Sequence, residues 1–286
     1  MKKILVTGAT GNVGTFVCDA LLNKGEGVVA AVTDISRATG KVNANAHMVE
    51  FDFTKPQTFN AALAGIDRVF LMRPPHLGKP EDLLPFIEAM KNANIRLVCF
   101  LSLMGVENNP VPPHHKIEKY IEKAGLPFVH IRPGFFMQNL TGIHLPEIKE
   151  KDEIFIPAGR SRCSFIDSKD IGLAIAEVLF DPNKYENTTA TITGPEALDY
   201  YQVAAIFSDI LGRRIVYKSP SIFKFRRYMI KERLLDKPMV NIMVMLYLMT
   251  RLGTAKKVTG DFQHITGLRP RSVRVFVEEN RACFEK

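Results

Sequence analysis

Three glycines at intervals of three follow the first apolar run of the chain, and they constrain its fold more than any other feature. The run "ILV" at residues 4–6 predicts a buried strand, and "TGATGNVG" places Gly8, Gly11 and Gly14 directly behind it. After the glycines, apolar residues recur at helical spacing as far as Leu22. A strand that turns through glycines into a helix is typical of the start of a doubly wound α/β sheet. We therefore predict this beginning for the chain.

Each glycine in the turn answers a different steric demand. Gly8 lets the backbone turn sharply, Gly11 lets a diphosphate approach the main chain, and Gly14 lets the helix pack close to the sheet. Backbone N–H groups at the helix start would point at the phosphates, where the helix dipole adds about half a positive charge. A purely structural turn is the alternative interpretation. The spacing favours a dinucleotide site made by Gly8, Thr10, Gly11, Asn12, Val13 and Gly14.

Apolar runs alternate with amphipathic stretches through the first half of the chain. The predicted strands lie at residues 3–9, 27–34, 47–53, 67–73, 96–103 and 128–134. Helices are predicted between them, with ends at Leu22, at Leu63 and near Asn92, and a further helix over residues 114–123. Strands that are apolar throughout and separated by helices indicate a parallel sheet covered on both faces. The predicted fold class is therefore α/β, with a doubly wound parallel sheet.

The pattern becomes irregular after about Thr141. Residues 163–180 predict another strand and helix, and residues 199–217 predict a helix and a strand. We predict a dinucleotide-binding domain over residues 1–153, to which residues 164–192 return, and a small, mostly helical lobe over residues 193–286. The apolar stretch at 240–249 is half as long as the roughly 20 residues of a membrane span. It predicts a buried, methionine-rich helix, with a membrane-contacting helix as the alternative.

Charge is concentrated in one segment of the chain. The formal net charge is +8, and nine of the Lys and Arg residues lie between Arg213 and Lys237, against Glu232 and Asp236 alone. Such a segment is a solvated basic face, or it attracts nucleic acid, anionic lipid or an acidic partner. The chain has no helix-turn-helix or zinc-finger spacing, so nucleic acid is the less expected partner.

Cysteine usage and the start of the chain indicate its compartment. Cys18 falls on a predicted helix and Cys99 in a predicted strand, so both are expected to be buried thiols. Together with Cys163 and Cys283 they form no metal-ligand spacing, and we expect no metal site. The first apolar run is interrupted by glycine too early for a secretory signal. We therefore expect a cytoplasmic protein without a membrane span.

Several stretches resemble one family. The spacing GxxGxxG differs from the standard GxGxxG and resembles that of the extended and atypical short-chain dehydrogenase/reductases. Residues 51–72, 116–140, 164–179 and 191–213 resemble the NmrA-like family of that superfamily, and "IRPGFFMQN" at 131–139 is the most specific piece. The resemblance runs from residue 3 to about residue 271. It implies a Rossmann domain, a small C-terminal lobe, and a cleft between them for nicotinamide and substrate.

The choice between NAD and NADP depends on the end of the second predicted strand. An acidic residue about 20 positions past the last glycine pairs with the ribose 2′-hydroxyl of NAD, whereas a nearby Arg accepts the 2′-phosphate of NADP. Asp34 has this offset, and Arg37 follows it. In NADP-using relatives an Arg commonly stands where this chain has Thr33. Arg37 can fork onto a phosphate, so we favour NADP slightly, with a solvated loop charge as the other interpretation of Arg37.

The resemblance also implies roles for residues at the ends of other strands. Asp52 and Phe53 match the position that contacts adenine, although Asp52 could instead cap a turn before Thr54. The ribose and nicotinamide are expected along Leu71, Met72, Arg73, Pro133, Gly134 and Phe135. Phe136 and Asn139 are expected to line the substrate.

The catalytic pair of the superfamily is missing. Alignment on the "EKYI" helix puts His114 at the Lys position and Pro110 at the Tyr position of the usual Tyr-x-x-x-Lys pair. In some NmrA-like reductases a Lys or His at this position donates a proton or holds the ribose, so the resemblance makes His114 a candidate, with a polar helix start as the alternative. Ser102 matches a serine that the superfamily keeps near the substrate, with strand-end hydrogen bonding as the alternative.

Two functions from different classes fit these residues. The first is an NAD(P)H-dependent oxidoreductase that passes hydride to a quinone-like or other conjugated small molecule, which needs less acid catalysis than an isolated ketone. The second is a non-catalytic, redox-sensing regulator that binds the dinucleotide and a protein partner. A third hypothesis is that the protein is an isomerase or reductase that acts on a specialised metabolite. We favour the first, and the sequence leaves the oligomeric state open.

Overall fold

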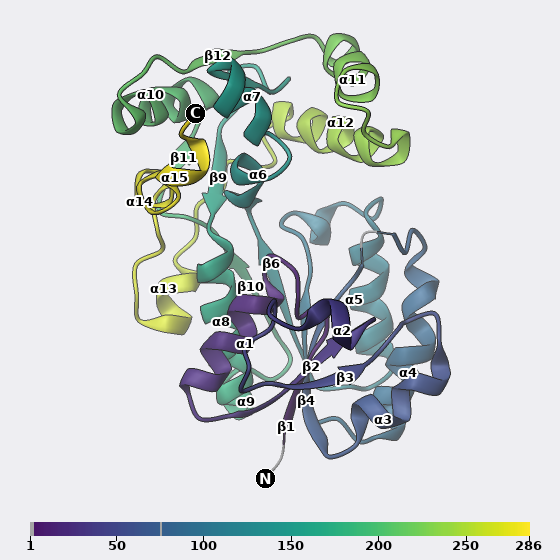
Figure 1. Ribbon diagram of the computed structural model, residues 1–286. Helices are drawn as coiled ribbons and strands as arrows, with labels where there is room; N and C mark the ends of the chain where they lie inside the picture. The colour runs from purple at the N-terminus through teal and green to yellow at the C-terminus, as the bar shows by residue number, and fades with distance from the viewer. Residues whose placement is uncertain (1–2, 75) are drawn as a thin grey trace. The chain divides into compact units, whose positions relative to one another are not determined.

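The computed structural model describes residues 3–74 and 76–286, and contacts between residues divide the chain into two compact units (Figure 1). Unit 1 consists of the described residues up to Pro133 together with residues 168–192 and 260–268. Unit 2 consists of residues 134–167, 193–259 and 269–286. The expected division ended the first domain at residue 153. The contacts instead group residues 134–153 with unit 2 and residues 260–268 with unit 1.

Unit 1 contains a parallel sheet of seven strands in the order β10-β6-β5-β4-β1-β2-β3. These strands are β1 (Lys3–Val6), β2 (Gly27–Val32), β3 (His47–Glu50), β4 (Ile66–Met72), β5 (Leu97–Leu101), β6 (Phe128–Pro133) and β10 (Thr188–Ile192). The chain runs outward from β1 to β3 and then returns to place β4 on the other side of β1. This reversal is the topological switch point at which ligands bind in doubly wound sheets. The predicted fold class is confirmed.

Helices cover both faces of this sheet (Figure 1). They are α1 (Gly14–Asn23), α2 (Ile35–Ala38), α3 (Phe59–Leu63), α4 (Leu84–Asn92), α5 (Pro113–Lys123), α8 (Ser168–Phe180), α9 (Pro182–Tyr185) and α13 (Asp261–Thr266). On one face α1 packs closely on α8, where a Cβ on Gly172 would lie 2.6 Å from Cβ of Phe16. Helix α13 packs against α8 and β10, which explains why residues 260–268 belong to unit 1.

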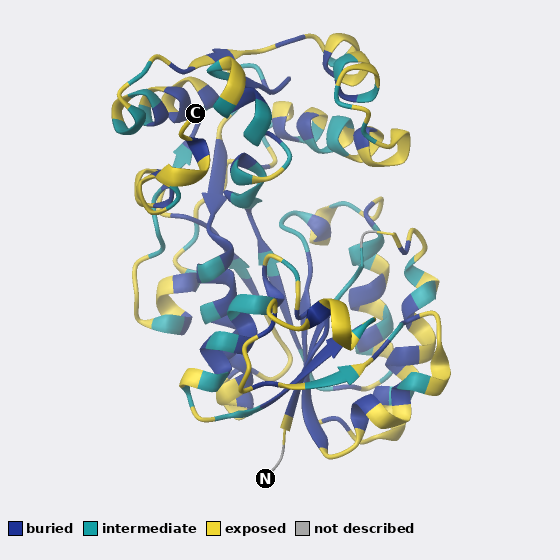
Figure 2. Ribbon diagram, viewed as in Figure 1, coloured by how far each residue is buried: buried dark blue, intermediate teal, exposed yellow. Residues whose placement is uncertain are grey.

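The other face of the sheet carries the main apolar core of unit 1, under α3, α4 and α5. Figure 2 shows the strands of this sheet as mostly buried. Phe86 on α4 lies at the centre of an aromatic group, with ring centroids 4.7 Å from Phe51, 5.0 Å from Phe59 and 5.5 Å from Phe53. Among the cysteines, the expected burial of Cys18 and Cys99 is confirmed.

Unit 2 contains two small sheets and several helices. Its strands are β7 (Phe135–Phe136), β9 (Cys163–Ile166) and β11 (Ala197–Leu198) in one sheet, and β8 (Glu153–Phe155) with β12 (Val216–Lys218) in the other. Its helices are α6 (Gln138–Thr141), α7 (Leu145–Lys151), α10 (Tyr200–Leu211), α11 (Ile222–Lys231), α12 (Lys237–Arg251), α14 (Val273–Glu279) and α15 (Arg281–Phe284). Of residues 164–192, which were expected to return to the first domain, 168–192 belong to unit 1 and 164–167 to unit 2. Residues 164–166 pair with β7 and β11.

Helix α12 corrects one expectation. The apolar stretch 240–249 was predicted to form a buried helix, but only one side of α12 is buried, through Val240, Tyr247 and Thr250. Ile242, Met245 and Leu248 on another side are exposed. Apolar residues run around the whole helix, so their spacing does not indicate which side faces a core. Among the described residues, no helix is long and apolar enough to cross a membrane.

Candidate functional site

The glycine turn joins β1 to α1, and its geometry admits only glycine at two positions. Gly8 has a φ of 63°, in the left-handed region, and a Cβ there would lie 2.3 Å from Sδ of Met72. A Cβ on Gly14 would lie 2.1 Å from the carbonyl oxygen of Gly8, and one on Gly11 would lie 3.2 Å from the same oxygen. The start of α1 therefore lies directly against the turn, and the end of β4 lies beside it.

Helix α1 begins without a cap from its own chain. Its N-cap residue is Val13, whose side chain accepts no hydrogen bond, and the first turn contains no acidic residue. Within the described part of the chain, no hydrogen bond is found for the backbone N–H groups of Asn12 and Val13. Unsatisfied N–H groups together with the positive end of the helix dipole form an anion site. The free N–H groups and the start of the helix therefore fit a diphosphate.

The end of β2 places Asp34 and Arg37 on one short loop. Asp34 is the N-cap of α2, and its Oδ1 accepts hydrogen bonds from the Ser36 hydroxyl at 2.6 Å and the Arg37 backbone N–H at 3.1 Å. These bonds lower the pKa of Asp34, the Ser36 hydroxyl having the larger effect. The guanidinium of Arg37 lies 3.5 Å from Asp34 Oδ2, and its side chain is 86% exposed. The carboxylate is thus fixed as a helix cap, whereas the guanidinium is exposed and pairs with the other oxygen of the same carboxylate.

Asp52 and Phe53 follow β3 and face different surroundings. Asp52 Oδ1 accepts hydrogen bonds from the backbone N–H and the hydroxyl of Thr54, at 2.9 and 2.7 Å. These bonds lower the pKa of Asp52. The ring of Phe53 is buried in the aromatic core beside Phe51 and Phe86. The second oxygen of Asp52 lies 3.8 Å from Nζ of Lys55. The ring of Phe53 is therefore not available to a ligand, and a ligand of Asp52 would compete with Lys55.

The end of β4 supplies one apolar and one charged side chain near the turn. Leu71 is fully buried in the core, whereas Met72 lies beside Gly8, and its backbone N–H donates to the Thr7 hydroxyl at 2.9 Å. The next residue is Arg73, whose Nη1 donates a hydrogen bond to the carbonyl oxygen of Leu77. Burial lowers the pKa of Arg73. No described residue forms a hydrogen bond with its buried Nε.

Ser102 stands at the end of β5 in a buried hydrogen-bond network. Its hydroxyl donates to Glu118 on α5, and Glu118 is held by two hydrogen bonds from Arg132 on β6, at 2.9 and 2.7 Å. Burial opposes ionisation of Glu118, but the Arg132 guanidinium and the Ser102 hydroxyl outweigh it, so the pKa of Glu118 is lowered. Ser102 is thus engaged at a strand end, as the alternative interpretation of this residue expects.

His114 lies in the first turn of α5, close to Arg73 and Glu118. Burial lowers its pKa to about 4, and the neighbouring positive charge of Arg73 adds to this effect, while Glu118 opposes it. Its ring centroid is 6.1 Å from that of Phe100, and no described residue forms a hydrogen bond with its buried Nδ1. The imidazole is therefore neutral near pH 7. We refer to Arg73, Ser102, His114, Glu118 and Arg132 as the polar cluster.

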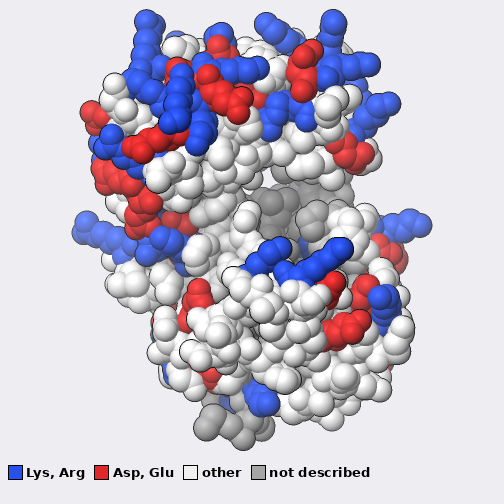
Figure 3. Space-filling model, viewed as in Figure 1, with Lys and Arg blue, Asp and Glu red and all other residues white. Residues whose placement is uncertain are grey.

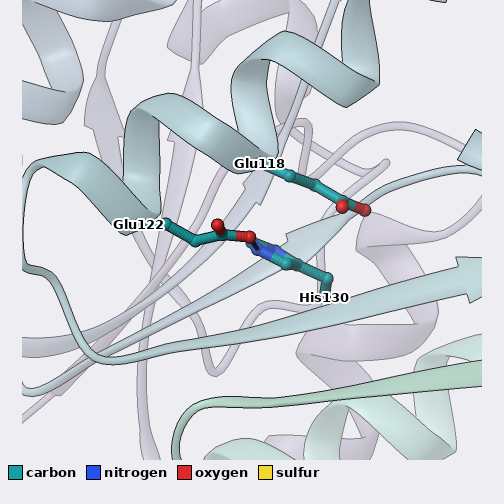
Figure 4. A group of neighbouring side chains, drawn as sticks. All are labelled: Glu118, Glu122 and His130. Carbon is teal, nitrogen blue, oxygen red and sulfur yellow. Dashed lines mark ion pairs between the residues drawn. The ribbon is translucent and has the colours of Figure 1, made fainter. Parts of the chain in front are cut away.

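Glu118 of this cluster also forms a group of potential metal ligands with Glu122 and His130, as Figure 4 shows. Atoms of Glu118, Glu122 and His130 lie within 4.8 Å of one another. His130 is fully buried, and its Nε2 lies 3.4 Å from Oε1 of Glu122 without hydrogen-bond geometry. The Arg132 guanidinium, however, already holds both oxygens of Glu118. A divalent cation would meet that fixed positive charge, so the three side chains form a poor metal site.

The remaining predicted residues follow β6. Pro133 ends this strand in unit 1, and the others belong to unit 2. A Cβ on Gly134 would lie 2.5 Å from the carbonyl oxygen of Ser164, so β7 starts close against β9. Phe135 has its ring 5.8 Å from that of Tyr247, while Phe136 and Asn139 are half-buried. The hydroxyl of Tyr247 lies 2.6 Å from Nε2 of buried His144, whose pKa burial lowers to about 3.

Comparison with known proteins decides the family. The sequence matches the profile described as the NmrA-like family over residues 1–267 of 286. The chain belongs to the NmrA-like family. Among curated NmrA-like relatives, Prestalk A differentiation protein A of Dictyostelium discoideum is 31% identical over 97% of this chain and 92% of its own. The NAD(P)H azoreductase of Xenophilus azovorans is 30% identical over 98% of this chain and 99% of its own.

Solved structures bear out the NmrA-like fold. The crystal structure of the Citrobacter sp. triphenylmethane reductase complexed with NADP(H) aligns with a TM-score of 0.88 and 21% sequence identity. The alignment covers 97% of this chain and 99% of that chain. At this identity the likeness establishes a shared fold.

The sequence did not predict two members of the polar cluster, Glu118 and Arg132. It also did not predict the contact between His144 and Tyr247 within unit 2. A signal for the first two was present, because Glu118 falls on the buried face of an amphipathic helix, four residues after His114, and Arg132 interrupts an apolar strand. A buried charge needs an oppositely charged partner. Glu118 and Arg132 are the partners of one another. His144 and Tyr247 are 103 residues apart, and nothing in the local sequence connects them.

Proposed function

We propose that this NmrA-like, NAD(P)H-dependent oxidoreductase passes hydride to a quinone-like or other conjugated small-molecule acceptor. The observation that carries the proposal is His114, which stands where the superfamily has its Lys and has a pKa lowered to about 4. No other described side chain restores the Tyr-x-x-x-Lys pair. The described part of the chain therefore offers no acid at this position for protonating an isolated ketone during hydride transfer, a contribution typically worth about 10²–10⁴-fold.

The dinucleotide would be held chiefly by the main chain of unit 1. The N–H groups of Asn12 and Val13 and the dipole of α1 would bind its diphosphate, and the glycines would let it approach. Met72 and Arg73, which end the neighbouring strand beside this turn, would lie along the ribose and nicotinamide. The reduced dinucleotide, when bound, supplies the hydride.

The acceptor must then take an electron pair without immediate protonation by the protein. The π system of a quinone or azo compound spreads the incoming charge, and water can supply the proton afterwards. A neutral His114 cannot act as an imidazolium acid near pH 7, but its N–H can donate a hydrogen bond to an oxygen or nitrogen on which charge develops. Burial keeps the imidazole neutral by lowering its pKa, and the positive charge of Arg73 adds to this effect.

NADP is proposed as the preferred dinucleotide. The Asp34 carboxylate already accepts two hydrogen bonds that fix it as the cap of α2. The exposed guanidinium of Arg37 on the same loop can turn to a 2′-phosphate, because a single weak ion pair with Asp34 is all that holds it. The name of the azoreductase relative, NAD(P)H azoreductase, leaves both dinucleotides open.

The test is to follow NADPH and NADH oxidation with three kinds of acceptor. Quinones and an azo dye should be reduced, and an aliphatic ketone of similar size should not. His114→Leu, which removes the N–H donor, should lower kcat on the quinone about 100-fold, with the same factor at pH 6 and pH 8. A factor that grows toward low pH would instead indicate that imidazolium donates the proton.

The same lack of an acid also favours the second candidate, a redox-sensing regulator that binds the dinucleotide without turnover. Tight binding of NADPH, measured by calorimetry, with no oxidation by any of the three kinds of acceptor would support the regulator and overturn the reductase. Absence of dinucleotide binding would overturn both.

A further inference from the structure

Helix α11 in unit 2 presents cations and exposed apolar side chains on one surface. Phe223, Arg227 and Ile230 are spaced by four and three residues and therefore share one side of the helix. Phe225 and Met229 are buried on the opposite side. The basic α11 surface, as we define it, consists of Phe223, Lys224, Arg226, Arg227, Ile230 and Lys231 of α11, together with Leu234, which follows the end of the helix by three residues.

The positive charge of this surface is mostly uncompensated. Residues 222–237 contain six Lys or Arg and two Asp or Glu. Arg233 is paired with buried Glu147, and Arg226 donates to the neutral side chain of Asn241. In the described part of the chain, no ion pair is found for Lys224, Arg227 or Lys231. Figure 3 shows Lys and Arg side chains gathered over the end of unit 2 that includes α11.

Two apolar side chains stand almost fully in solvent among these cations. Phe223 is 86% exposed and Leu234 is 83% exposed. Leu234 also has a φ of 53°, a left-handed conformation that a glycine or asparagine adopts at lower cost. Folding stability therefore explains neither the residue type nor its exposure. A partner that takes up both apolar groups and positive charge would explain them.

We propose that the basic α11 surface docks on an anionic lipid bilayer. Anionic headgroups attract Lys and Arg, and the boundary below them accepts aromatic and aliphatic side chains, so one partner matches both components. Nucleic acid matches the charge and could stack on Phe223, but it offers nothing to Leu234. The inference stands independently of the proposed function, because it concerns binding of the protein to a surface and not turnover.

Binding is measured by co-sedimentation of the full chain with vesicles of phosphatidylglycerol and phosphatidylcholine, and with phosphatidylcholine vesicles alone. We expect binding to the anionic vesicles that high salt weakens. The variant Lys224→Gln/Arg227→Gln/Lys231→Gln should bind about 100-fold more weakly, since each cation near such a surface contributes about fivefold. The control Lys41→Gln/Lys91→Gln/Lys123→Gln removes the same charge from exposed sites in unit 1 and should bind as the unaltered protein does.

A tryptophan reporter tests the apolar component separately. The chain has no tryptophan, so Phe223→Trp gives a single emission signal. This signal should shift to the blue on anionic vesicles and be quenched by brominated lipid chains, while Phe180→Trp, exposed in unit 1, should do neither. Circular dichroism and thermal unfolding would show that all variants fold.

Three outcomes would overturn the proposal. One is absence of co-sedimentation with anionic vesicles, and another is binding that leaves the Phe223→Trp emission unchanged. The third is tighter binding of a DNA or RNA oligonucleotide than of the anionic vesicles under the same salt, which would identify the surface as a nucleic-acid site.

Discussion

The glycine turn and the polar cluster occupy the same end of the sheet in unit 1, but they are built from different atoms. In the turn, backbone groups form the site. Gly8 and Gly14 have no side chain there because a Cβ would clash with neighbouring protein atoms. In the cluster, the site is formed by charged side chains that hold one another, as Arg132 holds Glu118 and Glu118 accepts from Ser102.

This difference determines how each region responds to change. A backbone site fails when an added atom does not fit, whatever the charge, the pH or the salt. A side-chain network responds to the loss of a charge by leaving its partner unpaired, and it responds to protonation. The turn should therefore be sensitive to one methyl group, and the cluster to single charges.

The largest effect should come from Gly14→Ala. Its Cβ would lie 2.1 Å from the Gly8 carbonyl oxygen, so the start of α1 must move away from the turn. We expect calorimetry to show NADPH affinity at least ~1,000-fold weaker, or about 4 kcal/mol. The control is Gly78→Ala, since a Cβ there meets nothing within 4 Å and the φ is ordinary. Equal affinity of the two variants would show that the turn does not hold the dinucleotide.

The glycine turn could be predicted from the sequence because steric demand there specifies the residue type. A left-handed φ at Gly8 and contact with backbone at Gly14 exclude every side chain, so the spacing alone carries the information. The same holds for the buried strands, in which every residue is apolar. The apolar run that precedes Ser102 also predicts that this residue lies at the end of a strand.

The rest depended on contacts between distant residues. Phe53 was expected to contact adenine, but alternation along the chain could not show that its ring enters the aromatic core. The partner of Ser102 lies 16 residues away, on a helix whose packing angle the sequence does not give. On α12, apolar residues on all sides left the buried side unspecified.

Within the polar cluster, Arg132→Met should have the next largest effect. It leaves the Glu118 carboxylate buried and unpaired, so the free energy of unfolding should fall by about 3 kcal/mol or more. Adding Glu118→Gln should restore much of this loss, because the buried charge is then absent. Denaturant unfolding measures both changes, and Arg96→Met, at an exposed site, is the control with a small expected effect. If the double variant were no more stable than Arg132→Met, charge would not explain the loss.

A smaller effect should appear in the way the free energy of unfolding depends on pH. Burial lowers the pKa of His130 to about 4 from 6.5, so the unfolded chain binds more protons than the folded one between these values. The stability due to neutral His130 is complete above pH 6.5 and is lost as the pH falls toward 4, by up to about 1.4 kcal/mol per pH unit. His130→Phe should make the unfolding free energy less dependent on pH between 6.5 and 5. An unchanged slope would mean that His130 does not titrate in this way.

The smallest effect tests how much the charge of Arg37, as distinct from the backbone of the glycine turn, contributes to dinucleotide binding. Arg37→Gln should weaken NADPH binding about fivefold and leave NADH binding unchanged, because an exposed guanidinium contributes about 1 kcal/mol to a phosphate contact in water. High salt should reduce the difference, whereas salt should not rescue Gly14→Ala. Asp34→Asn keeps an oxygen that can cap α2 but removes a negative charge, so it should strengthen NADPH binding relative to NADH. Lys41→Gln is the control for a lost positive charge nearby. If Arg37→Gln weakened both dinucleotides equally, Arg37 would support the loop and would not recognise the 2′-phosphate.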